Sequence, residues 1–274
     1  MVEFRTEKVT EHITRIFGIC TELMYLVEGN DKAALIDTGS GFGSLKKVVS
    51  ELTDKPVIVL LTHDHVDHAM GAAEFENVYM NHRDDDIFVR HGDDDFRWEG
   101  LELFADGAEV SREEYIPTGH VEDFRNLSGG DRFDLGGITV EIYDCEGHTS
   151  GSVAMLMKEE RVLLLGDACN DNTFLFEDYS LTLREYHNSL LRLKKETSGK
   201  YDTVLASHGA GSLPVTILDE VIEVCEDIET GNADDVLIEF RGNKGFLAKQ
   251  KDASGTRRMD GKVGNIVYNK DKIQ

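Results

Sequence analysis

The chain alternates between short, unbroken apolar runs and longer segments in which apolar residues recur every three or four positions. The short runs are rich in Val, Ile and Leu and are bounded by glycine or charged residues, a pattern typical of strands buried on both faces. Such strands need helices on either side of their sheet, so the pattern predicts an α/β fold. We expect strands at 33–36, 57–61, 138–143, 162–165 and 203–206, and helices at 44–52, 69–75, 180–197 and 214–229.

Two regions depart from this layered pattern. Residues 81–135 are polar and irregular, and we interpret their acidic runs at 84–86 and 93–95 as a solvated face. This region is the best candidate for a lid over a substrate, because it contains several aromatic residues: Phe96, Trp98, Phe104, Tyr115 and Phe124. The alternative is that these residues form a satellite core beneath a long loop. Residues 232–274 are expected to form a small antiparallel β-hairpin appendage, packed on a single domain over 1–231.

The protein has 274 residues, with 29 Lys and Arg against 53 Asp and Glu, so its formal net charge is −24. This balance disfavours nucleic acid and anionic membranes as partners, because both need a surface rich in Lys and Arg. No apolar run approaches the roughly 18 to 20 residues of a membrane span, and the N-terminus lacks the features of a signal peptide. The cysteines are widely spaced and fit free thiols in a reducing compartment. We therefore expect a cytoplasmic protein that acts on a small molecule, with C-terminal strands that could pair in a homodimer.

The strongest chemical signal follows the strand expected at 57–61. His63, His65, Asp67 and His68 fall within six positions there. Neutral imidazole and carboxylate groups are the usual ligands of zinc and related divalent metals. Protonated histidines packed so closely would repel each other, whereas a metal ion binds them in their neutral form. The segment is therefore predicted to bind metal.

Three other predicted strands are each followed by a potential ligand: His148, Asp167 and His208. Sites in open α/β sheets form beyond the carboxyl ends of the strands, so these side chains should converge on the loop at 63–68. Seven ligands are too many for one tetrahedral zinc with an open position. They suit two metals that share a bridging carboxylate.

These motifs resemble those of the metallo-β-lactamase-fold superfamily of hydrolases. The family signature H-x-H-x-D-H matches residues 63–68, and later motifs match Gly147-His148-Thr149-Ser150-Gly151-Ser152, Gly166-Asp167 and Ser207-His208-Gly209. The segment Leu35-Ile36-Asp37-Thr38-Gly39 matches another family motif, in which the Asp supports the metal loop without binding metal. The resemblance covers roughly residues 10–212. It implies an αββα sandwich, in which two mixed sheets face each other between outer helices.

Carried over position by position, the resemblance implies a dinuclear centre. The first metal would be held by His63, His65 and His148, and the second by Asp67, His68 and His208, with Asp167 bridging the two. Asp67 would also orient a hydroxide between the metals, which gives it a catalytic role. The metals are expected to be zinc, although these ligands also suit iron and manganese.

The bridging Asp167 resembles that of glyoxalase II, lactonases and esterase-like members. The β-lactamase branch uses a cysteine there, and Cys169 is offset by two positions. We therefore expect a hydrolase of a small ester, thioester or lactone, in which the bridging hydroxide attacks a carbonyl carbon. No glutathione site is expected, because the helix at 214–229 is acidic where glyoxalase II carries basic residues.

Two alternatives to a hydrolase remain. A persulfide dioxygenase-like oxidoreductase would use a single iron on His63, His148 and Asp167. A metal-dependent scaffold would use the acidic surface to bind a basic partner.

Residues outside these motifs are given structural roles. Cys145 and Cys169 are expected to be packed free thiols, and Tyr25, on an early strand, could reach the pocket. We interpret the remaining histidines as surface or loop residues: His12, His82, His91, His120 and His187.

Overall fold

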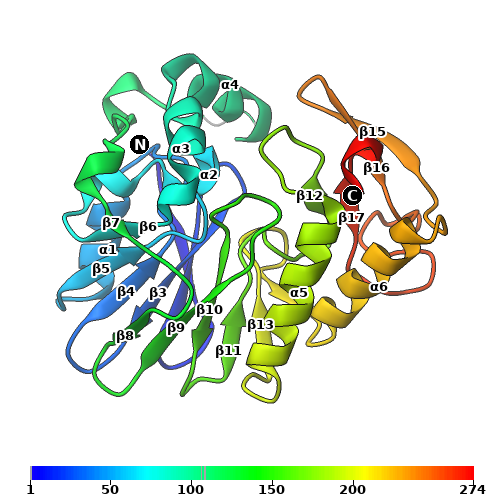
Figure 1. Ribbon diagram of the computed structural model, residues 1–274. Helices are drawn as coiled ribbons and strands as arrows, with labels where there is room; N and C mark the ends of the chain where they lie inside the picture. The colour runs from blue at the N-terminus through cyan, green and yellow to red at the C-terminus, as the bar shows by residue number, and fades with distance from the viewer. Residues whose placement is uncertain (1, 106, 108) are drawn as a thin grey trace.

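The computed structural model describes residues 2–105, 107 and 109–274 and confirms the αββα sandwich. Figure 1 shows two large sheets face to face, with helices on the outer side of each. The first sheet has the order β1-β2-β3-β4-β5-β6-β7 and is antiparallel as far as β4 and parallel beyond it. Its strands are β1 (Arg5–Lys8), β2 (Ile13–Phe17), β3 (Leu23–Glu28), β4 (Ala33–Ile36), β5 (Val57–Leu60), β6 (Val78–Met80) and β7 (Arg125–Asn126).

The second sheet has the order β14-β13-β11-β10-β9-β8 and is also mixed. Strands β11 and β13 are parallel, and the other neighbours are antiparallel. The strands expected at 33–36, 57–61, 138–143, 162–165 and 203–206 are present with their ends within one residue, and β3 is the early strand expected to carry Tyr25, whereas β2 and β10 were not anticipated. The strands of this sheet are β8 (Arg132–Asp134), β9 (Thr139–Asp144), β10 (Val153–Met157), β11 (Val162–Leu164), β13 (Thr203–Leu205) and β14 (Ser212–Leu213).

The core is layered because successive side chains of a strand point to opposite faces of the sheet. In β4, Ala34 and Ile36 belong to the buried cluster between the sheets, together with Met155 and Leu164 of the second sheet. The intervening Leu35 belongs to the cluster beneath the outer helices. Both faces of these strands are therefore buried, as their unbroken apolar runs predicted.

Helices α1 (Leu45–Leu52), α2 (Val66–Ala69) and α3 (Asp85–His91) cover the first sheet, and α5 (Leu183–Thr197) and α6 (Ile217–Glu229) cover the second. The sequence located α1, α5 and α6 to within three residues at each end. The start of α5 is set by a capping box, in which Thr182 accepts from the backbone N–H of Glu185 and the Glu185 carboxylate accepts from Thr182 in return. None of the helices in the described part of the chain combines the length and apolar character that a membrane span needs.

The helix expected at 69–75 is misplaced. Helix α2 begins at Val66, inside the histidine-rich motif, and a separate 3-10 turn follows at Ala72–Glu74. The backbone N–H of Met70 donates to the Gly39 carbonyl, and Gly71 passes so close to the Thr38 carbonyl that a Cβ would lie 2.3 Å from its oxygen. Contacts with the loop after β4 therefore end α2 early.

The expectation that residues 81–135 are irregular is wrong, because they contain α3 and α4 (Asp94–Phe104). The acidic runs lie at the starts of these helices. Asp93 caps α4 by accepting a hydrogen bond from the N–H of Phe96. Acidic residues in the first turns of α3 and α4 interact favourably with the positive N-terminal ends of the helix dipoles. Asp84 is fully buried, which also contradicts its assignment to a solvated face.

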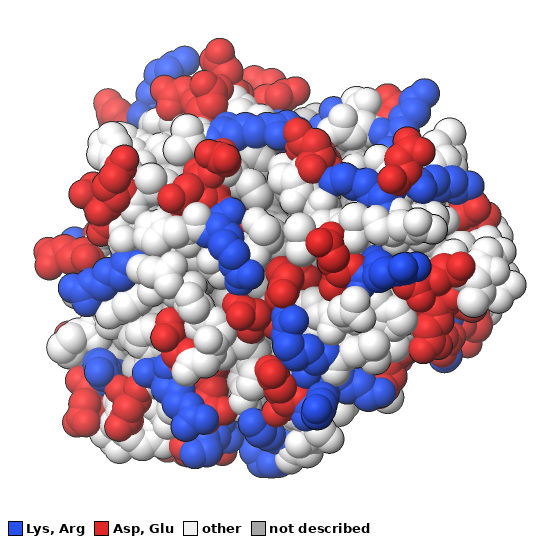
Figure 2. Space-filling model, viewed as in Figure 1, with Lys and Arg blue, Asp and Glu red and all other residues white. Residues whose placement is uncertain are grey.

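The C-terminal region forms a third sheet with the order β12-β17-β16-β15. Strands β15 (Val236–Phe240), β16 (Asn243–Leu247) and β17 (Ile266–Tyr268) are antiparallel, whereas β12 (Thr173–Leu175) lies parallel to β17. Ion pairs Lys249–Asp227 at 2.7 Å and Arg258–Glu223 at 3.1 Å join this region to α6. In Figure 2, basic side chains are interspersed with acidic ones over the face shown.

Candidate metal centre

The seven predicted ligands lie together at one edge of the sandwich, beyond the carboxyl ends of four strands. The loop and short helix after β5 carry the first four of them. His148, Asp167 and His208 follow β9, β11 and β13. The convergence expected from the strand ends is therefore present.

His63, His65 and His148 form a first cluster, in which one potential ligand atom of each lies within 4.8 Å of the others. Nδ1 of His65 faces Nε2 of His148 at 3.1 Å. Nε2 of His63 is buried and has no hydrogen-bond partner. Nitrogen lone pairs that face one another so closely are unfavourable unless a proton or a cation lies between them.

Neighbouring groups fix the tautomers of two of these rings. The Thr62 hydroxyl donates to Asp37 at 2.8 Å, so it accepts from Nδ1–H of His63 at 3.1 Å and leaves the Nε2 lone pair of that ring free. Nδ1–H of His148 donates to the Phe174 carbonyl at 2.8 Å, with the same result. Such contacts are typical of metal-ligating histidines, whose second nitrogen is held by a hydrogen bond.

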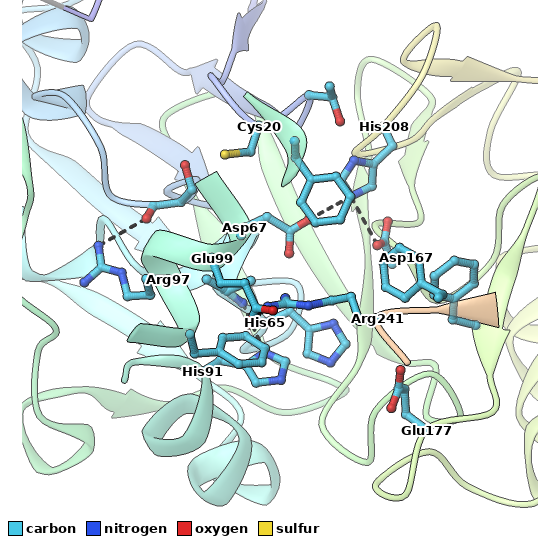
Figure 3. A pocket seen from close by; sticks show the side chains of 18 of the residues that line it. Cys20, His65, Asp67, His91, Arg97, Glu99, Asp167, Glu177, His208 and Arg241 are labelled. Atoms are coloured by element: carbon cyan, nitrogen blue, oxygen red, sulfur yellow. Dashed lines mark hydrogen bonds and ion pairs between the residues drawn. The ribbon is translucent and has the colours of Figure 1, made fainter. Parts of the chain in front are cut away.

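Asp67, His68 and His208 form a second cluster beside the first. Nε2 of His208 lies 3.3 Å from Oδ2 of Asp67 and 3.2 Å from Oδ2 of Asp167, contacts that are dashed in Figure 3. Asp167 also forms a potential ligand group with His63 and His68. Its carboxylate therefore lies between the two clusters, where a bridging ligand is expected.

The two clusters carry different charges. Burial, and then the neighbouring histidines, hold the pKa values of His63 and His65 well below the ordinary value, so both rings are neutral. Burial alone would also lower the pKa of His208, but Asp167 and Asp67 outweigh it and raise this pKa to about 10. In the same way Asp67 and Asp37 outweigh burial and raise the pKa of His68 well above its usual range. In the metal-free protein, protons therefore supply the positive charge that the carboxylates of the second cluster require.

Asp37 supports the centre without belonging to either cluster. Its carboxylate accepts from the backbone N–H of Thr62 at 2.7 Å, from the Thr62 hydroxyl and from Nδ1–H of His68 at 2.9 Å. Asp37 has a φ of +61°, a conformation that Asp tolerates better than most residues. The loop after β4 thus orients both the His63 ring and the His68 ring.

A cavity of about 470 Å³ adjoins the two clusters (Figure 3). Five of the ligand candidates line it: His65, Asp67, His148, Asp167 and His208. Residues of α4 and of the C-terminal sheet also line it. The region expected to act as a lid thus supplies part of the cavity wall.

His91 is a site residue that the sequence did not reveal, and its expected surface position is wrong. The ring is buried, lies 4.7 Å from that of His65 and stacks on Phe96. Its Nδ1 accepts from the backbone N–H of Val66, and burial lowers its pKa to about 4, so the ring is neutral with its hydrogen on Nε2. Only the position of His91 at the end of α3, facing the metal loop, identifies it.

Two further buried carboxylates hold the loops of the site. Asp84 accepts from the Thr149 and Ser150 hydroxyls and from the N–H of Gly151, and so anchors the loop that presents His148. Glu22 accepts from the N–H of Cys20 and from Ser40 in the cavity wall.

The suggestion that Tyr25 could reach the pocket is wrong. Its side chain is fully buried, and its hydroxyl donates to the Ala206 carbonyl at 2.6 Å. The expectation of packed free thiols at Cys145 and Cys169 is confirmed.

Parts of this chain are similar in sequence to proteins named as hydrolases. Human acyl-coenzyme A thioesterase MBLAC2 is 25% identical over 170 residues, which cover 56% of this chain and 60% of that protein. A hydroxyacylglutathione hydrolase from Xanthomonas oryzae is 28% identical over 142 residues, covering 52% of this chain and 44% of the hydrolase. The alignments therefore span less than two thirds of these relatives.

Solved structures show the same fold at low identity. A metallo-beta-lactamase from Pontibacter korlensis aligns with a TM-score of 0.56 at 18% identity, over 82% of this chain and all of that one. An archaeal metallo-beta-lactamase superfamily protein from Sulfolobus tokodaii aligns with a TM-score of 0.53 at 18% identity, over 81% of this chain and 84% of that one. The family model described as the metallo-beta-lactamase superfamily matches residues 18–208, which include every ligand candidate. The chain belongs to the metallo-beta-lactamase superfamily.

Proposed function

We propose that the protein is a metal-dependent hydrolase that cleaves thioesters at a dinuclear centre. The first metal would be held by His63, His65 and His148 and the second by Asp67, His68 and His208, with Asp167 between them. The observation that carries the proposal is the presence of both ligand clusters side by side, with the Asp167 carboxylate within reach of each. Unpartnered lone pairs at His63 and the facing nitrogens of His65 and His148 fit cations there.

Divalent metal ions in such a site lower the pKa of coordinated water to about 7 and so supply a nucleophile at neutral pH. The chain itself contributes orientation and charge. Burial would raise the pKa of Asp67, but the neighbouring His68 and His208 outweigh it and hold this pKa below its usual range, so Asp67 is an ionised hydrogen-bond acceptor facing the cavity. It would accept a hydrogen bond from the attacking water and fix its direction of approach.

Hydrolysis forms a C–O bond at the acyl carbon and breaks the C–S bond, giving a carboxylate, a thiol and a proton. A thiolate is a good leaving group, since the pKa of a thiol such as that of Cys is about 8.5. The reaction therefore needs no strong general acid from the protein. The thioesterase and hydroxyacylglutathione hydrolase names of the relatives support thioesters over the esters and lactones that the sequence left open.

The proposal is tested with metal-loaded protein and a panel of acyl thioesters, esters and lactones. We expect thioesters to give the highest kcat/KM. Asp67→Asn should lower kcat by at least about 100-fold, in the range that one positioned group contributes to proton transfer. His120→Ala is the matched control, because His120 lies exposed outside the clusters. Absence of hydrolysis across the panel by fully loaded protein would overturn the proposal.

Metal content separates this function from the persulfide dioxygenase alternative. The alternative needs a single iron on His63, His148 and Asp167, and it leaves the second cluster without a role. Oxygen consumption with a persulfide substrate, together with one iron per chain, would favour it over hydrolysis.

A further inference from the structure

Part of the cavity wall is apolar and mostly aromatic, and we define it as the aromatic chamber: Phe42, Leu101, Phe104, Phe174 and Phe240. The rings of Phe104 on α4 and Phe240 on β15 stack with centroids 5.9 Å apart, and Phe174 meets Phe240 edge-on at 5.1 Å. The helix of the lid region and the C-terminal sheet are thus the two main walls of this chamber. Asp67, Asp167 and His208 line the same cavity.

Gly100 keeps the chamber open. It is a buried residue in the middle of α4, yet a Cβ built on it would meet no atom within 4 Å other than those of its chain neighbours and the backbone of its own helix. A buried helical position with open space in front of it faces a void, and Gly100 lines this cavity. Glycine destabilises a helix relative to alanine, so helix stability does not explain a glycine at this position. Open space for a ligand does explain it.

The basic side chains beside the chamber are already paired. Arg97 is fully buried and donates to the carbonyls of Ser40, Gly41 and Ile116. Arg241 reaches across the cavity toward α4 in Figure 3, where it pairs with Glu99 at 3.1 Å. Arg90, the third arginine that lines the cavity, pairs with Asp178 at 3.0 Å. Among the described residues of its lining, the cavity therefore offers aromatic surface to a ligand and no unpaired arginine for an anionic group.

We infer that the aromatic chamber binds an apolar acyl chain of the substrate, with Gly100 setting the length of chain that fits. The inference rests on the proposed thioester hydrolysis and names its substrate class. With the acyl carbon at the two ligand clusters, the acyl chain would extend between α4 and β15 and the thiol portion would lie toward the open side. A small polar acyl group would leave the chamber unfilled.

The first test compares kcat/KM for straight-chain acyl thioesters of one small thiol, from acetyl to decanoyl, with a hydroxyacyl thioester of matched length. Burial of each methylene should raise kcat/KM by up to about fourfold until the chamber is full. Gly100→Leu should lower the ratio of decanoyl to acetyl kcat/KM by at least about tenfold, and Phe240→Ala should raise it. Glu102→Leu, on the exposed face of the same helix, is the matched control and should leave the ratio unchanged.

The second test measures binding without catalysis. Trp98 is the only tryptophan, and its ring contacts Phe42 of the chamber at a centroid distance of 5.0 Å, so its fluorescence should report occupancy. Decanoate should change this fluorescence at lower concentration than acetate, and Gly100→Leu should weaken the effect. Thermal unfolding of each variant shows whether it is folded.

The outcomes distinguish the two claims. Equal kcat/KM for all chain lengths, or a preference for the hydroxyacyl thioester, would overturn the chamber assignment and leave thioester hydrolysis standing. No hydrolysis of any thioester, with decanoate binding that Gly100→Leu abolishes, would overturn the proposed function and support the chamber as an apolar-chain site.

Discussion

Replacement of Asp37 by Asn tests how the fold prepares the metal centre. The substitution preserves shape but exchanges one acceptor oxygen for an NH₂ donor. Oδ1 of Asp37 accepts from the Thr62 N–H, and Oδ2 accepts from the Thr62 hydroxyl and from Nδ1–H of His68. Whichever way the amide is placed, its NH₂ group faces a neighbour that donates a hydrogen bond to Asp37 in the original protein, so two donors meet.

When His68 gives up one proton to become a neutral ligand, the least costly response keeps its remaining hydrogen on Nε2 instead of Nδ1, so that Nδ1 accepts from the new amide. Nε2 is the atom that faces Asp67, Asp167 and His208, and a protonated nitrogen cannot bind metal. We therefore expect Asp37→Asn to weaken the second metal site by about 10- to 100-fold, as loss of such supporting groups typically does. Disturbed buried hydrogen bonds should also lower the free energy of unfolding by about 2–4 kcal/mol.

The assay is metal retention during titration with a chelator of known affinity, alongside urea unfolding of the metal-free protein. Asp31→Asn, at an exposed turn in the same sheet region, is the matched control. Retention of both metals by Asp37→Asn with unchanged affinity would refute the argument that Asp37 fixes the His68 tautomer.

Three other predictions follow from the structure. Zinc added to the metal-free protein at pH 7 should release about two protons per chain, because the raised pKa values of His68 and His208 keep both rings charged until metal displaces the protons. His208→Gln should reduce the release by about one proton per chain. The pKa of Glu223 is lowered by Lys262 and Arg258, so its ion pairs stabilise the C-terminal region above the unfolded pKa of about 4.3 and are lost as the pH falls further. Protection of residues 249–268 against hydrogen exchange, relative to the intrinsic rate at each pH, should fall below that pH before global unfolding, and unchanged protection would contradict this. Arg97→Met should lower the free energy of unfolding by about 3 kcal/mol or more, because the carbonyls that Arg97 contacts lose their donor. An unchanged midpoint of urea unfolding would argue against a role of Arg97 in holding α4 against the loop after β4.

The metal ligands were predictable because their signal is local. Strands β5, β9, β11 and β13 are buried apolar runs, and the ligands stand directly after them. Position at a strand end then fixes which edge of the sandwich each side chain occupies. The role of Asp37 came only through the family resemblance, and the structure explains it by hydrogen bonds to Thr62 and His68.

The supporting residues were not predictable because tertiary contacts alone define them. His91 lies in a region that the sequence predicted to be irregular, and only the packing of α3 against the loop that holds His65 makes it part of the site. Asp84 belongs to an acidic run that composition assigns to the surface, yet contacts with Thr149 and Gly151 bury it. The aromatic chamber likewise exists only because β15 pairs with β16 opposite α4, regions far apart in the sequence.

The number of metal ions bound per chain is the decisive measurement for the proposed dinuclear centre. Elemental analysis should be made on protein purified without added metal or chelator, and repeated after loading with zinc. We expect close to two metal ions per chain, falling to about one in a His208→Ala variant. A single ion that does not rise on loading, or no metal in either preparation, would contradict the dinuclear centre.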